Sequence, residues 1–372
     1  MSRVLVTGGA GFVGSHTVDA LLARGHEVRV FDNFIGQVHG EARPDYLNDD
    51  AEIVVGDIRD PESMRKAVRG VDAIFHFAAA VGVGQSMYEI ANYVGTNTQG
   101  TANLLQAILD TRAEIGKLVV ASSMSIYGEG RYRCNACGDV VARPRTAEQL
   151  RFKRWDPACP QCDRELTPVP TDESKPTQCT SIYALSKKDQ EEMALLFGRT
   201  YVVPTVALRY FNIYGTRQAL SNPYTGVAAI FAARLLNGRA PLIFEDGRQM
   251  RDFVSVHDIV RANLLALETS GADGEAVNIG SGHPISIREV AADLVRTLGV
   301  DVEPEVTGNV RMGDIRHCFG DLTKARARLG YEPQVRFAEG VKEMLAWLRS
   351  QTPPPDRASE ATLQLQLYGL TA

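Results

Sequence analysis

The chain begins with a short apolar run that leads into a glycine-rich turn and then into a helical pattern. The run is Val4-Leu5-Val6, the turn reads TGGAGFVG from Thr7 to Gly14, and the amphipathic stretch after it closes at Gly25. Glycines at a strand-to-helix turn let the backbone approach a pyrophosphate, whose charge is favoured by free N–H groups and the helix dipole. This segment predicts a dinucleotide site in an α/β fold, with a plain turn as the alternative.

The same alternation continues over the first 128 residues. Further apolar runs stand at 28–31, 53–55, 73–77 and 118–121, and amphipathic stretches separate them. Strands that are apolar on both faces and are separated by helices indicate a parallel sheet with helices packed on each side. We therefore predict an α/β protein with a Rossmann-type doubly wound parallel sheet.

This pattern divides the chain into four parts. Residues 129–170 break the rhythm, because they are rich in Arg, Pro and Cys and carry no sustained apolar period. We expect a dinucleotide-binding domain from 1–128 and 171–211, an insertion at 129–170, a smaller lobe mainly for the substrate at 212–352, and a tail at 353–372. The tail alternates Leu with polar residues, which predicts either a strand added to a sheet edge or a disordered end.

Two aspartates refine the expected dinucleotide site. Asp32 ends the second expected strand, where a carboxylate can accept hydrogen bonds from the adenosine ribose and would repel a 2′-phosphate. The next residue is Asn33 rather than an arginine, so the sequence favours NAD over NADP. Asp57, in GDIRD after the third expected strand, is placed to meet the adenine amino group, with a helix cap as the alternative.

Three side chains form a candidate proton-transfer site. Tyr183 and Lys187 are four residues apart in SIYALSK, so one helix face presents both. A neighbouring ammonium favours the phenolate form of tyrosine, which makes Tyr183 a proton acceptor for a sugar or alcohol hydroxyl. Ser123 follows the fifth apolar run, where residues past the ends of parallel strands line the ligand crevice.

The sequence resembles the extended short-chain dehydrogenase/reductases that act on nucleotide sugars. The motifs that carry the resemblance occur in that family's order and spacing, from Val4 to about Leu348 apart from the insertion. They are TGGAGFVG, the Asp32-Asn33 pair, GDIRD, HFAAAVGVGQS, ASSMSIYG, YALSK, RYFNIYG, RDFVSVHD, VNIGSG and GDIRHCFGDLTKAR.

The resemblance implies roles for individual residues. The implied catalytic residues are Tyr183, Lys187 and Ser123. The residues expected along NAD are Gly8, Gly11, Phe12, Val13, Asp32, Asn33, Asp57, Ile58, Ala78, Ala79, Ala80, Asn97, Tyr183, Lys187 and Phe211. The residues expected to hold the nucleotide sugar are Ser123, Asn212, Arg251, Arg311 and Asp314, and guanidinium groups suit a doubly charged diphosphate.

One departure from the family pattern bears on the reaction. In the family's 4,6-dehydratases the residues after the catalytic Thr or Ser are Asp and Glu, whereas this chain has Met124 and Ser125. Neither side chain transfers a proton to a departing hydroxyl at neutral pH. The remaining chemistry is 4-epimerisation: oxidation at C4 to a 4-keto sugar, then return of the hydride to the opposite face.

Only the resemblance indicates which sugar is the substrate. The segments QVHG, VGVGQSMYEIA and ALSNPYTGVAAIFAARLLNG resemble bacterial enzymes that interconvert dTDP-L-rhamnose and dTDP-6-deoxy-L-talose. Alternatives are a UDP-hexose or UDP-uronate 4-epimerase, a nucleotide-sugar dehydrogenase or reductase, and a non-enzymatic NAD-sensing scaffold. Relatives usually form homodimers through helices that include the one carrying Tyr183, so a homodimer is expected.

Four of the six cysteines predict a metal site in the insertion. Cys134 and Cys137, and Cys159 and Cys162, form two C-x-x-C pairs, the arrangement of a four-thiolate zinc ribbon, with four free thiols as the alternative. Such a ribbon can also dock nucleic acid or protein. The insertion has eight Lys and Arg against six Asp and Glu, so it is near neutral once four thiolates hold one Zn²⁺. A phosphate-binding surface is distinctly basic, so we favour a structural zinc clip.

Charge and hydropathy limit the remaining partners. The chain of 372 residues has a net charge of -5 and no apolar run long enough to span a bilayer. These features predict a protein without nucleic-acid or membrane partners, and the absence of a leader-like N-terminus favours a cytoplasmic location.

Overall fold

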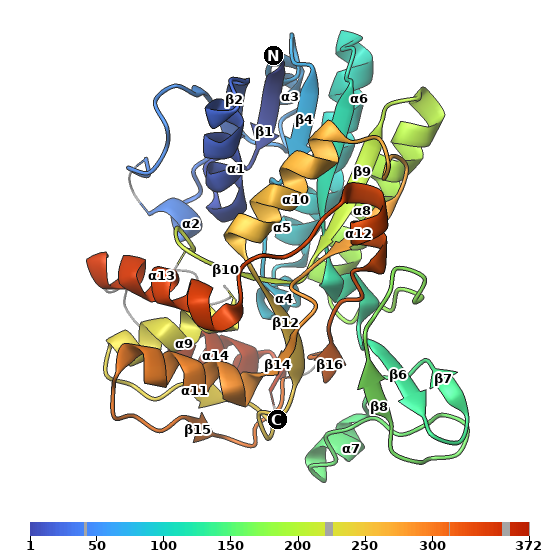
Figure 1. The fold of residues 1–372 in the computed structure, drawn as a ribbon, viewed down its shortest axis with the longest axis vertical. Helices are drawn as coiled ribbons and strands as arrows, with labels where there is room; N and C mark the ends of the chain where they lie inside the picture. The colour runs from blue at the N-terminus through green and yellow to red at the C-terminus, as the bar shows by residue number, and fades with distance from the viewer. Residues whose placement is uncertain (41–42, 220–225, 312, 352–357, 372) are drawn as a thin grey trace.

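The larger of the two lobes is built on a seven-stranded parallel sheet (Figure 1). The computed structural model describes residues 1–40, 43–219, 226–311, 313–351 and 358–371. The strands lie in the order β13 (Ala276–Ile279), β9 (Thr205–Tyr210), β5 (Lys117–Ser123), β4 (Ala73–His76), β1 (Arg3–Thr7), β2 (Glu27–Asp32) and β3 (Glu52–Val55). The chain leaves the middle of this sheet in opposite directions from β1, which confirms the predicted doubly wound fold.

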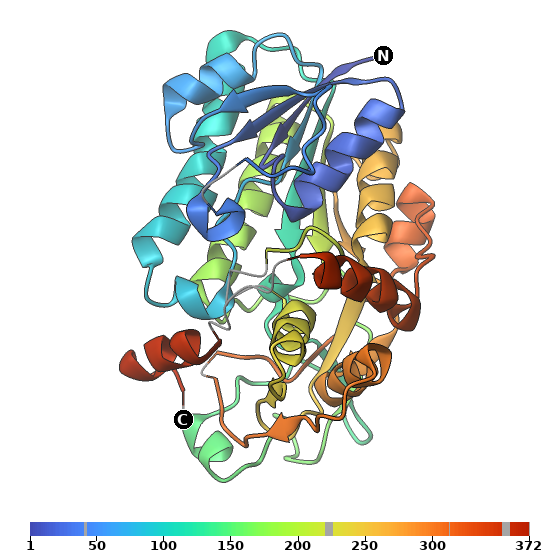
Figure 2. The ribbon, with the colours of Figure 1, turned by 90° about the vertical axis from the view of Figure 1, so that its left-hand side faces the viewer.

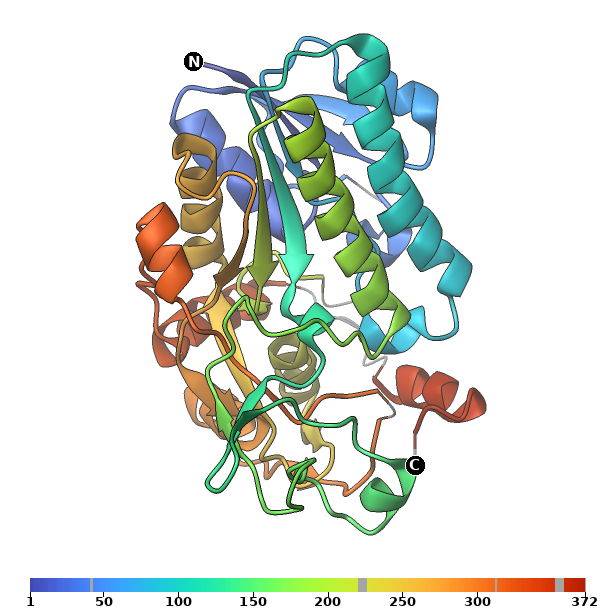
Figure 3. The same ribbon diagram turned by 90° about the vertical axis from the view of Figure 1, so that its right-hand side faces the viewer.

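Helices cover both faces of the sheet, as the apolar strands predict. Val4 and Val6 of β1 pack in one core with the helices α1 (Phe12–Ala23) and α10 (Val256–Glu268). Leu5, which points to the other face, packs with α3 (Pro61–Ala67), α6 (Gly100–Thr111) and α8 (Ile182–Tyr201). Figure 3 shows α6 and α8 side by side on that face.

Short elements follow the strands at the carboxyl edge of the sheet. They are α2 (Gly36–His39), α4 (Val83–Ser86), α5 (Ile90–Tyr93), the π-helical turn η1 (Val94–Gln99) and the 3-10 turn η2 (Met124–Tyr127). Because η1 runs directly into α6, its residues lie between the sheet edge and the helix layer.

A second lobe lies below the sheet (Figure 2). Its own sheet joins β10 (Asn212–Tyr214), β12 (Met250–Ser255), β14 (Pro284–Ser286) and β16 (His317–Cys318), and β11 (Leu242–Ile243) pairs with β15 (Glu305–Val306). A separate apolar core holds α9 (Val227–Leu236), α11 (Ile287–Leu298) and α13 (Phe337–Ser350) together. Residues 256–279, which fall inside the range expected to form mainly this lobe, return to the large sheet as α10 and β13, and α12 (Thr323–Leu329) packs against β13.

The insertion forms a small antiparallel sheet of its own. The strand β6 (Arg131–Cys134) pairs with β7 (Gly138–Val140) and β8 (Thr167–Val169), and α7 (Ala147–Arg151) follows the first cysteine pair. Its core contains only Tyr132, Cys134, Val140, Ala142, Cys159 and Leu166 as buried members. A core of this size rarely holds a fold without a disulfide or a metal.

The prediction of a strand or a disordered end for the tail is wrong for the part that the structure describes. Residues Ala358–Leu367 form the helix α14, which lies below the segment of α4 and α5 in Figures 2 and 3. The segment that forms α14 consists mainly of Ala, Gln and Leu, which favour helix, and this local preference overrides the alternation of period two. Among the described residues no helix is both long and apolar enough to cross a bilayer.

Candidate functional site

A cavity of about 660 Å³ opens where the carboxyl ends of the parallel strands face the second lobe. Residues at the ends of β1, β2, β4 and β5 line one end of the cavity, and residues of β10, α9 and β12 line the other. This is the position at which ligands bind in open α/β sheets, because the chain departs in opposite directions there.

The glycine turn at this edge leaves no room for side chains. Gly8 has a φ of +68°, and a Cβ on it would lie 2.7 Å from the backbone nitrogen of Ala78. A Cβ on Gly14 would lie 2.1 Å from the carbonyl oxygen of Gly8. The turn therefore requires glycine for its own packing, and it presents bare backbone to the cavity, as a pyrophosphate site requires.

Asp32, at the end of β2, contacts the glycine turn. Its carboxylate accepts hydrogen bonds from the backbone N–H of Ala10, at 3.0 Å, and of Phe34, at 2.9 Å, and it lines the cavity beside Asn33. The carboxylate retains lone pairs that can accept the hydroxyls of a ribose. The geometry is thus compatible with the expected role of Asp32 toward NAD.

Most of the residues expected along NAD do line the cavity. They are Gly8, Gly11, Phe12, Val13, Asp32, Asn33, Ile58, Ala78, Ala79, Ala80, Tyr183, Lys187 and Phe211. The set fits a dinucleotide that runs from the glycine turn toward Tyr183.

Two residues of that expected set lie outside the cavity lining. Arg59 binds the carboxylate of Asp57 with its Nε at 2.9 Å and holds its pKa down at about 2, and Asn33 contacts the same group. Asn97 is fully buried behind the wall, where it binds both the N–H and the C=O of Ala80 and the hydroxyl of Ser186. Asn97 therefore positions the backbone that lines the cavity.

Tyr183, Ser123 and Lys187 all line the cavity, and Tyr183 hydrogen-bonds Ser123. The backbone N–H of Tyr183 donates to Ser86 Oγ at 3.0 Å, which fixes the start of α8. Burial raises the pKa of Tyr183, and a hydrogen bond with Ser123 opposes that rise. A buried phenol of this kind requires a nearby positive charge to give up its proton at neutral pH.

Lys187, four residues after Tyr183, is a buried cation on the same helix. Its Nζ donates to Gln190 Oε1 at 2.7 Å, and Gln190 continues to Thr101 and to the neutral ring of His76. Burial lowers the pKa of Lys187 to about 7, and that of His76 to about 3. Lys187 therefore loses its proton, and with it the positive charge, near neutral pH.

The opposite end of the cavity brings together the residues expected to hold the nucleotide. Asn212, Arg251, Arg311 and Asp314 all line the cavity, and Ser123, at the end of β5, lines it as well. The Nη atoms of Arg251 bind the carbonyl oxygens of Met250, Ile315 and Arg316 and the carboxylate of Asp314. The Arg311 guanidinium lies 4.0 Å from the centre of the Phe244 ring.

Buried polar atoms without partners mark the same end of the cavity. Among the described residues, the side-chain oxygens of Asn212, Gln218 and Gln249 are buried and accept no hydrogen bond, although all three residues line the cavity. Orphaned polar groups of this kind are costly unless a ligand or water satisfies them. They indicate a polar ligand at this end.

Sequence reasoning missed several residues of the lining. Gln218, Phe244 and Gln249 carry no motif of their own, and only the fold brings them to the cavity. The tail was also missed: Leu365 and Leu370 line the cavity, and Tyr368 stacks on Tyr88 with ring centres 4.9 Å apart.

The four cysteines of the insertion gather at one point. Their Sγ atoms all lie within 4.8 Å of one another, and those of Cys134 and Cys162 are 3.6 Å apart. Four sulfurs around a zinc ion, each at about 2.3 Å from it, are about 3.8 Å apart. Backbone N–H groups of Ala136 and Cys137 lower the pKa of Cys134, whereas hydrogen bonds from the neighbouring cysteines raise the pKa of Cys137.

Two family models match the chain on either side of the insertion. The model of the NAD dependent epimerase/dehydratase family matches residues 4–147, and the GDP-mannose 4,6 dehydratase model matches residues 165–344. Residues 148–164, which include the second cysteine pair, lie outside both matches.

Individual relatives match over nearly the whole chain. The chain is 33% identical over 354 residues to dTDP-L-rhamnose 4-epimerase of Burkholderia thailandensis, which covers 94% of this chain and 95% of that protein. UDP-glucose 4-epimerase of Mycolicibacterium smegmatis is 32% identical, with 94% and 99% covered. The solved structure of Thermus thermophilus UDP-glucose 4-epimerase in complex with NAD has a TM-score of 0.75 at 30% identity and covers 94% of this chain and 100% of its own.

The lowered pKa of Lys187 predicts a pH-dependent contribution to stability. The unfolded chain keeps this lysine protonated up to about pH 10.4, whereas the folded apoprotein loses the proton above about pH 7. The wild type should therefore gain stability over the Lys187→Met variant as pH rises from 7 to 9, by up to about 1.4 kcal/mol per pH unit. Urea unfolding of both apoproteins at pH 7, 8 and 9 measures this difference, and parallel profiles would contradict it.

Proposed function

The chain belongs to the NAD-dependent epimerase/dehydratase family and is an NAD-dependent nucleotide-sugar epimerase, and we propose that it inverts C4 of a dTDP-linked 6-deoxyhexose. The observation that carries the proposal is the set of groups at the centre of the cavity. Ser123 and Tyr183 are present, whereas the next two residues, Met124 and Ser125, offer no acid or base for removal of water. This set favours epimerisation over dehydration, although one of the matching family models is that of a dehydratase.

The residues of this chain act on the proton of the substrate hydroxyl. Tyr183 accepts the proton from the C4 hydroxyl, and Ser123 hydrogen-bonds the same oxygen. The positive charge of Lys187 favours the phenolate, which burial alone disfavours. Inversion then requires the same residues to return the proton after the sugar has turned its other face toward the cofactor.

The backbone of the glycine turn, Asp32 and the segment Ala78 to Ala80 would hold NAD, which supplies a hydride acceptor and donor when bound. Asn97 supports this site from behind by fixing both backbone groups of Ala80. Because the hydride returns to the sugar in each turnover, the reaction needs no added cofactor.

The choice of a dTDP-linked 6-deoxyhexose rests on sequence similarity and on where the similar segments lie. The relative from Burkholderia thailandensis is named dTDP-L-rhamnose 4-epimerase. Described residues of all three segments that resemble such enzymes line the cavity: Gln37 to His39, the run from Val81 to Gln85, and residues of α9 with Gly226 before it. Their place in the lining supports a role in substrate choice, and dTDP-L-rhamnose and dTDP-6-deoxy-L-talose are the proposed pair.

Incubation with a panel of nucleotide sugars tests this proposal. The purified protein, without added NAD, should convert dTDP-L-rhamnose to its C4 epimer, as followed by NMR of the C4 proton. We expect turnover of dTDP-L-rhamnose to exceed that of UDP-glucose, UDP-glucuronate and GDP-mannose.

The Tyr183→Phe variant is the matched control, because it removes one hydroxyl and keeps the aromatic ring in the cavity lining. Its turnover should fall by roughly 10²- to 10⁴-fold, the usual contribution of a positioned acid or base, while bound NAD is retained. Inversion of UDP-sugars but not of dTDP-L-rhamnose would contradict the proposed substrate. Stoichiometric accumulation of NADH would indicate a dehydrogenase instead of an epimerase. Full activity of Tyr183→Phe would contradict the catalytic role of Tyr183.

We propose that Cys134, Cys137, Cys159 and Cys162 bind one structural zinc ion. The support is the convergence of four sulfurs at the distances given above and the small core of the insertion, which leaves little apolar burial to hold the two knuckles together. All four positions are taken by cysteine, so no open position remains for catalysis.

Metal analysis of the purified protein should find one zinc ion per chain. The Cys134→Ser variant should lose the zinc and unfold at a lower temperature, because the ion no longer joins the two knuckles. The Cys179→Ser variant is the control: its thiol lies outside the cluster and donates to the Ile126 carbonyl, so zinc should be retained. A zinc-free wild type with unchanged stability would contradict the proposal.

We also propose a homodimer that uses α8, the helix that begins just before Tyr183. Leu185 and Leu196 stand three turns apart on one face of this helix and are 45% and 58% exposed in the single chain. Light scattering should give twice the chain mass of 40.6 kDa, and replacing both leucines with glutamate should give the single-chain mass. A wild-type monomer would contradict the dimer.

A further inference from the structure

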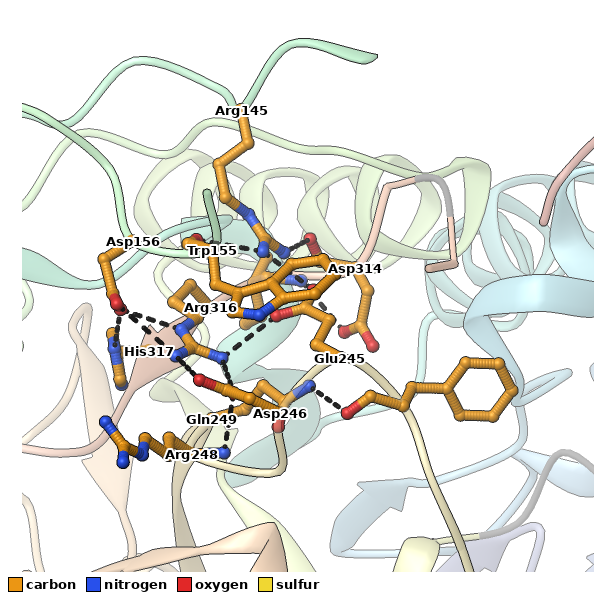
Figure 4. Close-up of polar contacts among 12 residues, drawn as sticks. Arg145, Trp155, Asp156, Glu245, Asp246, Arg248, Gln249, Asp314, Arg316 and His317 are labelled. Atoms are coloured by element: carbon orange, nitrogen blue, oxygen red, sulfur yellow. Dashed lines mark hydrogen bonds and ion pairs between the residues drawn. The ribbon is translucent and has the colours of Figure 1, made fainter. Parts of the chain in front are cut away.

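A buried network of charged side chains joins the cysteine-containing insertion to the second lobe (Figure 4). Arg145 and Asp156 come from the insertion, Glu245 and Asp246 follow β11, and Arg316 precedes β16. The side chains of Arg145, Glu245 and Arg316 are only 2%, 2% and 1% exposed. Residues this far from water are held in place by their partners, because an unpaired buried charge is strongly destabilising.

Arg145 bonds three separate parts of the chain at once. Its Nη1 donates to Glu245 Oε1 at 2.7 Å and to the carbonyl oxygen of Trp155 at 3.2 Å. Its Nη2 donates to the carbonyl oxygen of Asp314 at 2.9 Å. The planar guanidinium thus links the insertion to the backbone of residue 314.

Arg316 completes the network from the other side. It binds Asp156 through Nε at 2.8 Å, Glu245 through Nη1 at 3.0 Å, and Asp246 through Nη1 and Nη2 at 2.6 and 3.0 Å. Each guanidinium in the network faces carboxylates from a different segment. Movement of the insertion would therefore leave buried charges unpaired.

The segment that this network holds is also a wall of the cavity. Asp314 lines the cavity and binds Arg251, and Arg251 in turn binds the carbonyl oxygen of Arg316 at 2.8 Å. Phe244, which contacts Arg311 from the lining, precedes Glu245 directly. Both arginines expected to meet the diphosphate are thus attached to backbone that Arg145 and Arg316 fix from outside.

We propose that Arg145 is a positioning residue for the nucleoside diphosphate of the substrate. It acts through the Asp314 carbonyl and Glu245 to set the places of Arg251 and Arg311, and it makes the insertion part of the substrate site without contact to the reacting sugar. This inference rests on the proposed function, because it takes the ligand at this end of the cavity to be a nucleoside diphosphate.

The test uses the Arg145→Lys variant and dTDP alone as the probe. Lysine keeps the buried positive charge but cannot make the same set of bonds from a planar fork. The affinity for dTDP, measured by calorimetry, should fall about tenfold, KM for the sugar substrate should rise by a similar factor, and kcat should change by less than about twofold. NAD content should stay unchanged, because the cofactor residues lie on the large sheet.

Two further variants separate positioning from stability. Arg133→Lys is the matched control, since Arg133 belongs to the same insertion, is 60% exposed and pairs with Asp139 at the surface; it should bind dTDP as the wild type does. Asp156→Asn should fold even if Arg145→Lys does not, because Asp156 is half exposed. It loses the charge that faces Arg316, so its dTDP affinity should also fall.

Each other outcome contradicts a definite part of the account. Equal dTDP affinity of the wild type and both network variants would overturn the positioning role of Arg145 alone. A loss of dTDP affinity matched by equal losses of NAD and of the unfolding temperature would reduce the network to a structural role and overturn the proposal. A wild type that binds neither dTDP nor UDP would contradict the proposed function itself.

Discussion

The close packing of the glycine turn against the end of β4 determines the geometry of the whole carboxyl edge of the sheet. The backbone N–H of Gly8 donates to the Phe31 carbonyl at 2.8 Å, so the turn is bonded to β2 as well. No side chain larger than hydrogen fits at Gly8 or Gly14. This contact places the carboxyl ends of β1, β2 and β4 side by side, and residues at these ends line the cavity.

Asp32 and Asn97 extend this arrangement by the same principle. Each is a buried polar side chain whose partners are mainly backbone groups at the strand ends, so each converts a loop into a fixed surface. The second lobe uses charged groups for the same purpose, where Arg145 and Arg316 hold the segment behind Arg251. The two ends of the cavity are thus built by different means, and Tyr183 and Ser123 lie between them.

Local sequence patterns predicted the features that depend on neighbouring residues. The glycine turn, Asp32, the pair Tyr183 and Lys187, and the two cysteine knuckles each occupy one short segment whose geometry follows from strand or helix periods. The helical tail was mispredicted because a period of two in leucine outweighed helix preference. Asp57, which the resemblance places at the adenine, binds Arg59 two residues further on, and its role toward the cofactor stays a prediction.

Local sequence patterns do not predict contacts between segments that are far apart in the chain. Arg145 and Glu245 are 100 residues apart, and nothing in either segment indicates a buried pair. The sequence therefore predicts the zinc clip but not the contacts of the insertion with the second lobe. Gln218 and Gln249, whose unpaired oxygens indicate a polar ligand, were also missed, because neither belongs to a motif.

The central claim is that the hydrogen at C4 leaves the sugar as a hydride, stays on the enzyme and returns to the opposite face. The most direct test uses dTDP-L-rhamnose deuterated at C4, incubated with the holoenzyme in ordinary water and examined by NMR and mass spectrometry. The account predicts that the C4 epimer forms with its deuterium retained at C4. Inversion with loss of deuterium to water would contradict it, because the C4 hydrogen would then leave as a proton.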